Sequence, residues 1–137
     1  MARAPSMFVP LDVNYPRDPR IRRAGPDAEL LYVRGLAYAK GGETDGMVYD
    51  YDMPVVAVGL TRVTQRIGAL EREKAWERRE DGWFIAGWFN WNEPTATLRD
   101  QKRRRTEGAA KTNHRKHTEA GVQFVGSCLV CMGEVAV

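Results

Sequence analysis

The sequence predicts an α+β fold in which three helices precede a β-hairpin, followed by a basic helical extension and a small C-terminal module. Three observations predict it. Apolar residues recur at helical spacing between Pro26 and Trp76, an Asp-Gly turn separates two aromatic runs, and all histidines and cysteines fall within residues 114–131. With 43% hydrophobic residues among 137, the chain can fill one modest core, which excludes wholesale disorder.

Residues 1–25 are expected to form an N-terminal strand and a short helical turn. Phe8–Tyr15 carries the apolar residues of a short strand, and Pro10 restricts that strand to an edge. Asp18 is expected to cap one helical turn, because Pro19 is well suited to a first helical position.

Residues 26–93 are expected to form the main domain. Its first helix begins at Pro26 and ends at Gly41-Gly42, with apolar residues at three- and four-residue spacing: Leu30, Leu31, Val33, Leu36 and Ala37. A short strand, Met47–Tyr49, follows. A short helix capped by Asp52 then carries Val55, Val56 and Val58.

A third helix is expected from Thr61 to about Trp76, with a buried stripe formed by Val63, Ile67, Leu70 and the aliphatic stem of Lys74. Glu80-Asp81-Gly82 then predicts a hairpin between Trp76–Arg79 and Trp83–Trp88. Helix, turn, helix and hairpin in this order are typical of a winged helix-turn-helix. The four tryptophans are expected to pack in the core or the hairpin.

The third helix predicts contacts with double-stranded DNA, because a helix fits the major groove and a hairpin reaches the backbone. Gly68 and Ala69 are small enough for close approach, glutamine pairs with adenine, and arginine pairs with guanine or phosphate. The expected contacts from the helix and the wing are Thr61, Arg62, Gln65, Arg66, Ala69, Arg72, Arg78 and Arg79.

Residues 94–112 are expected to form a basic helix or an extended linker. The run from Arg99 to Lys116 holds eight basic residues against Asp100 and Glu107, within a chain of net charge +3. A local excess of this kind suits a polyanion, because each phosphate contact releases a counterion. The expected phosphate contacts are Lys102, Arg103, Arg104, Arg105 and Lys111.

Residues 113–137 are expected to form a zinc-binding module. His114, His117, Cys128 and Cys131 follow the pattern H-x2-H-x10-C-x2-C, and Gly133 follows the cysteine pair as in a zinc knuckle. Four filled positions would leave none for water, so a structural Zn²⁺ is predicted. The alternative is two exposed histidines beside a reduced cysteine pair.

No catalytic residue is expected. With both histidines on the metal, none remains as a general base for a His-Asn-His nuclease. Asp45, Asp50 and Asp52 are explained by loop and cap roles more simply than by magnesium. Proline and aspartate interrupt Met1–Val13, so this segment lacks the apolar core of a signal peptide. No apolar stretch is long enough to span a bilayer, so a cytoplasmic protein without a membrane partner is expected.

The chain resembles winged helix-turn-helix DNA-binding proteins of actinobacterial phages and prophages, some of them replication initiators or replisome organisers. The stretches that carry the resemblance are Phe8–Gly25, Ala28–Lys40, Thr44–Val48, Gly82–Thr95 and Asn113–Cys131. The resemblance implies a winged helix acting on phage or prophage DNA, in replication or gene control. Many members carry a tryptophan where this chain has Lys116, so packing around the metal is expected to differ.

Two functional hypotheses follow. The first is a non-enzymatic protein that binds double-stranded DNA in replication initiation or transcriptional control. The second is an adaptor that binds or inhibits a host or phage replication or transcription protein. A metal-dependent nuclease is a third hypothesis, which the sequence supports less. No heptad pattern in the sequence defines an oligomeric state.

Overall fold

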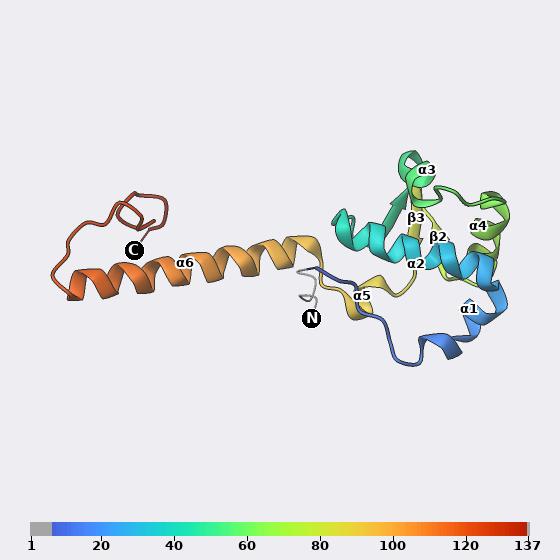
Figure 1. The fold of residues 1–137 in the computed structure, drawn as a ribbon, viewed down its shortest axis with the longest axis horizontal. Helices are drawn as coiled ribbons and strands as arrows, with labels where there is room; N and C mark the ends of the chain where they lie inside the picture. The colour runs from blue at the N-terminus through green and yellow to red at the C-terminus, as the bar shows by residue number, and fades with distance from the viewer. Residues whose placement is uncertain (1–6, 137) are drawn as a thin grey trace. The chain divides into compact units, whose positions relative to one another are not determined.

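The computed structural model describes residues 7–136. Met1–Ser6, which belong to the Met1–Val13 segment discussed above, and Val137 lie outside the described residues. The chain divides into two compact units, Met1–Thr95 and Ala96–Val137. The first unit is an α+β fold of short helices and one three-stranded sheet, and the second is built on a single long helix (Figure 1).

Two helices open the first unit. Asp18 caps α1 (Pro19–Ala24) as expected, because its carboxylate accepts the backbone N–H of Arg20 at 2.9 Å. Gly25, at φ +92°, turns the chain into α2 (Pro26–Gly41), which also begins at a proline. In Figure 1, α1 and α4 (Val63–Arg72) lie beside each other against α2.

The sheet is antiparallel, with strand order β1-β3-β2. β1 (Met47–Tyr49) pairs with β3 (Gly82–Ile85), and β3 also pairs with β2 (Trp76–Arg78), so the expected hairpin is confirmed. Gly82 is required at the start of β3, because a Cβ there would lie 2.5 Å from the carbonyl oxygen of Val48.

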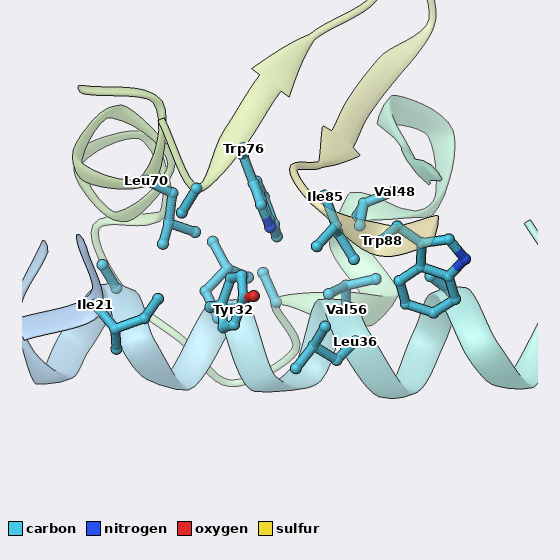
Figure 2. Close-up of a cluster of buried hydrophobic side chains, with 14 residues drawn as sticks. Ile21, Tyr32, Leu36, Val48, Val56, Leu70, Trp76, Ile85 and Trp88 are labelled. Carbon is cyan, nitrogen blue, oxygen red and sulfur yellow. The ribbon is translucent and has the colours of Figure 1, made fainter. Parts of the chain in front are cut away.

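The core lies between α2, α4 and the sheet (Figure 2). Trp76 is almost fully buried and stacks on Trp83, and its indole approaches Gly35 so closely that a Cβ there would meet Cζ2 at 2.8 Å. Trp88 is also buried. Trp91 is 66% exposed, so the expectation that all four tryptophans serve packing is wrong for this residue.

The strand expected at Phe8–Tyr15 is absent. The segment makes no strand pairing, Phe8, Leu11 and Val13 are exposed, and a 3-10 turn, η1, spans Tyr15–Arg17. Alternating apolar residues favour a strand only where a neighbouring backbone offers a ladder, and none does so here.

The third helix is shorter than expected. α4 covers Val63–Arg72, whereas Thr61 and Arg62 precede it and Trp76 already belongs to β2. The helix ends because Lys74 adopts φ +59°, a left-handed conformation that turns the chain into the hairpin. Lys74 is exposed and does not extend the buried stripe.

Three short elements complete the first unit: the 3-10 turn η2 (Asp50–Asp52), α3 (Met53–Val56) and α5 (Trp88–Trp91). Asp52 precedes α3 without a side-chain capping bond, because its carboxylate accepts the hydroxyl of Tyr38 instead.

The second unit contains α6 (Thr95–Glu119), so the basic segment is a helix and not an extended linker. The helix continues across the boundary expected between residues 112 and 113. After it, the chain turns back along the last part of α6 (Figure 1). Within residues 7–136, no helix is both long enough and apolar enough to cross a lipid bilayer.

Candidate functional site

Four metal-ligating side chains meet at the C-terminal end of α6. His114 and His117 lie on its last turns, and Cys128 and Cys131 lie in the turn that follows. Their nearest nitrogen and sulfur atoms all lie within 4.8 Å of one another. The Nδ1 atom of His114 lies 3.6 Å from Sγ of Cys128 and 3.4 Å from Sγ of Cys131, and Nε2 of His117 lies 3.4 Å from the latter sulfur.

These distances fit a single ion. Metal–nitrogen and metal–sulfur bonds of about 2.0–2.3 Å in a tetrahedron separate the ligand atoms by roughly 3.3–3.8 Å. The observed contacts between nitrogen and sulfur fall in that range. The four residues can therefore hold one metal ion, as the sequence spacing predicts.

A backbone carbonyl orients one of the histidines. Nδ1 of His117 lies 2.7 Å from the carbonyl oxygen of Val122, which can only accept, so this nitrogen carries the proton. The lone pair of Nε2 is then directed at the cysteines. The same hydrogen bond raises the pKa of His117, with a further contribution from Cys128. The role of Val122 could not be predicted from the sequence, because Val122 acts through its backbone carbonyl and not through its side chain.

The cysteine turn favours the thiolate that a metal needs. Burial alone would raise the pKa of Cys128, but the backbone of Cys131 and the two neighbouring histidine rings lower it to about 6. Gly133 closes the turn at φ +78° and donates its N–H to the carbonyl of Val130. Apolar side chains cover this turn only in part, because Val122 and Phe124 are exposed.

Of the residues on and around α4 that are expected to contact DNA, some are exposed and others are buried or half-buried. Thr61, Arg62, Gln65 and Arg72 are exposed, whereas Arg66 is only 9% exposed and Ala69 packs against the core. Arg62 pairs with Asp27 at 3.1 Å, and Arg72 pairs with Glu73 at 3.4 Å.

The expectation that Arg66 contacts DNA is therefore corrected. Its Nη1 donates to the carbonyl of Asp27 at 2.7 Å, and its Nε donates to the carbonyl of Thr61 at 2.8 Å. The sequence carried a signal for this, because Arg66 is three residues from Val63 and four from Leu70, on the buried side of α4. Ala69 is corrected for the same reason, since it is half-buried against the core and not free to approach a groove.

The hairpin arginines are exposed, and each is paired with an acid. Both Nη atoms of Arg78 donate to Asp50 at 2.7 Å, which lowers the pKa of that carboxyl group. Arg79 pairs with Glu77 at 3.1 Å and lies over the ring of Phe84. The hairpin is therefore close to electrically balanced.

The positive charge of the chain is concentrated in the second unit. Met1–Thr95 contains 13 basic and 14 acidic residues, whereas Ala96–Val137 contains eight basic and four acidic residues. The five basic residues expected to contact phosphate are all exposed on α6: Lys102, Arg103, Arg104, Arg105 and Lys111.

The three aspartates considered as a magnesium cluster each have another structural contact. Asp45 accepts the backbone N–H and the hydroxyl of Thr95, Asp50 holds Arg78, and Asp52 holds Tyr38. Within residues 7–136, the histidine–cysteine cluster is the group of metal-ligating residues that the geometry brings together.

Comparisons with known proteins identify no relative: no family model, no curated protein and no solved structure matches the chain.

Proposed function

We propose that the chain is a non-enzymatic protein that binds double-stranded DNA through a winged helix in its first unit. The topology supports this proposal: α3, a short turn and α4 are followed by the β2–β3 hairpin, and β1 completes the sheet in the order β1-β3-β2. In winged helices this arrangement presents the second helix of the pair to the major groove and the hairpin to the backbone.

The observation that carries the proposal is the outer face of α4. Thr64, Gln65, Gly68 and Arg72 are exposed at helical spacing. A Cβ at Gly68 would meet no atom within 4 Å, so no packing contact explains a residue that weakens a helix interior. A glycine there permits close approach to a groove, with Gln65 and Arg72 on either side to contact bases or phosphates.

We further propose that the metal is a structural Zn²⁺. Two imidazoles and two thiols form a four-ligand set that zinc prefers, and all four positions are filled. Ion binding would stabilise a unit with little core, since the buried residues in its described part, 96–136, are Ala110 and Cys128. On the resemblance described above, we propose a role in replication initiation or transcriptional control.

The experiment is a fluorescence anisotropy titration with duplexes drawn from a random pool, comparing the full chain with Gln65→Ala/Arg72→Ala. We expect at least about tenfold weaker binding of the variant, since each good base contact contributes about 1–3 kcal/mol. Arg17→Ala, an exposed arginine outside α4, is the matched control and should bind as the parent does. Equal affinities for parent and double variant would refute the assignment of α4.

The adaptor remains a second candidate because of one surface. Tyr51, Val55 and Val58, next to or on α3, are each about two-thirds exposed or more. Apolar side chains of this size in one neighbourhood are typical of protein contacts. Absence of binding to random duplex at low salt would favour the adaptor over the DNA-binding protein.

A further inference from the structure

One face of α6 combines unpaired cations with small side chains. Residues spaced by three and four positions share a side of a helix, and those on this face are all exposed. We call it the α6 cationic face, and its members are Lys102, Arg105, Ala109, Thr112, Asn113 and Lys116. At a rise of 1.5 Å per residue the face is about 21 Å long.

The acidic residues of this stretch lie on another side. A helix turns by about 100° per residue, so Asp100 and Glu107 are rotated by roughly 160° and 140° from Lys102. There they neutralise the neighbouring arginines: Arg103 and Arg104 pair with Asp100 at 2.5 and 3.0 Å, and Arg103 also approaches Glu107 at 4.0 Å.

The cations of the α6 cationic face have no such partners. Within residues 7–136, no ion pair involves Lys102, Arg105 or Lys116. Three of the unpaired cations of the basic run therefore share one side of the helix, whereas Lys111, which also has no ion pair in the described part of the chain, is rotated by about 180° from Lys102.

The metal-binding turn leaves this face open. Ala110, which is buried, and the ligands His114 and His117 lie roughly 90–150° from the centre of the α6 cationic face. The returning chain therefore packs on one side of α6, and the six residues remain exposed on the other.

We propose that the α6 cationic face is a second surface for duplex DNA, in which α6 lies in a major groove. The proposal rests on the proposed DNA-binding function and adds a reading element to it. Lys102, Arg105 and Lys116 bind phosphates, and Asn113 pairs with a base edge while Ala109 and Thr112 face thymine methyl groups.

The side-chain sizes favour a groove over a flat acidic protein surface. Between Arg105 and Lys116 the face carries no long side chain, so a helix about 10–12 Å across can enter a groove about 12 Å wide.

The test compares two double variants of the full, zinc-loaded chain that remove equal charge from adjacent positions. Lys102→Ala/Arg105→Ala removes two unpaired cations, and Arg103→Ala/Arg104→Ala removes two cations that are paired with Asp100 and Glu107. With a 20-base-pair duplex, the first variant should bind at least about tenfold more weakly at 0.1 M salt. The slope of log K against log salt should fall by about 1.8, since each phosphate contact contributes about 0.9.

The second variant should change the affinity and the slope far less. Equal losses of affinity and slope in both variants would overturn the proposal, because the binding would then depend on the total charge of α6 and not on one face. Metal content and circular dichroism show whether each variant keeps its fold, and Lys116→Ala, at the far end of the face, gives an independent measurement with an expected slope change of about 0.9.

Asn113→Ala tests the reading role. The variant should keep its affinity for random duplex and lose the preference for a sequence selected from a random pool by the parent chain. An unchanged preference would overturn that part. If the Gln65→Ala/Arg72→Ala variant weakens binding and the α6 variants do not, this inference fails while the proposed function stands. If the α6 variants weaken binding and the α4 variant does not, only the role of α4 is rejected. Binding of an acidic protein in preference to duplex would reject both.

Discussion

Arg66 and Asp27 are joined inside the first unit, where the guanidinium on α4 donates to the backbone carbonyl at the start of α2 at 2.7 Å. The same side chain holds the carbonyl of Thr61, so one arginine fixes the segment that leads into α4. These two hydrogen bonds explain why Arg66 faces inward.

Replacing Arg66 with methionine should lower the free energy of unfolding by about 2 kcal/mol, because two partly buried carbonyls would lose a charged donor. Urea denaturation checks this. Gln65→Ala, one position away and exposed, should change stability by no more than about 0.5 kcal/mol. A methionine variant as stable as the parent would contradict the structural role of Arg66.

Two glycines in helices should respond in opposite directions to alanine. Gly35→Ala places a Cβ 2.8 Å from the indole of Trp76 and should destabilise the first unit by about 1–3 kcal/mol. Gly68→Ala enters open space and should stabilise α4 by about 0.5–1 kcal/mol. Thermal denaturation of both variants tests the packing of α2 on the hairpin, and a gain in stability from Gly35→Ala would exclude that packing.

Removal of the metal should affect the second unit alone. One equivalent of zinc is expected per chain, and Cys128→Ser or a chelator should abolish it, because each ligand position is needed for a filled tetrahedron. Hydrogen exchange should then accelerate from about residue 110 onwards, while α2 and the sheet stay protected. Ser127→Ala, next to the ligand, is the matched control and should keep the metal.

The cap of α1 should give a defined pH dependence. Partial burial acts to raise the pKa of Asp18, but the hydrogen bonds from Arg20 outweigh it and lower that pKa below its ordinary value. The ionised cap therefore stabilises the fold above the unfolded-state pKa of about 3.9, and this contribution is lost as the pH falls through the lower folded-state pKa.

Asp18→Ala should accordingly cost about 1 kcal/mol at pH 7, and the difference from the parent should shrink below about pH 3. Asp18→Asn keeps the accepting oxygen and removes the titration, so it separates the hydrogen bond from the charge. A stability difference that is constant between pH 7 and pH 2.5 in urea denaturation would contradict the assignment.

The elements that sequence predicts well are those with a local cause. Asp18 with Pro19, the Gly41-Gly42 stop and the Asp81-Gly82 turn act through their own backbone, and the structure confirms each of them. The spacing of the histidines and cysteines likewise predicts their convergence, because one helix and one turn suffice to bring them together.

The errors arise where tertiary contacts decide. The alternation in Phe8–Tyr15 lacks a strand to pair with, and α4 stops early because Lys74 takes a left-handed conformation that no residue type there requires. The neutralisation of Arg78 could not be predicted either, since only the fold brings Asp50, at the start of η2, to Arg78 on β2.

The placement of the tryptophans divides the spectroscopic signals of the molecule. All four tryptophans and all five tyrosines precede Thr95, and the second unit holds Phe124 as its one aromatic residue besides the histidines. Near-ultraviolet absorption and intrinsic emission consequently report on the first unit, whereas much of the helical ellipticity comes from the 25 residues of α6. A melting curve followed by emission would miss the loss of the second unit, and two probes in one sample would resolve the two halves without any label.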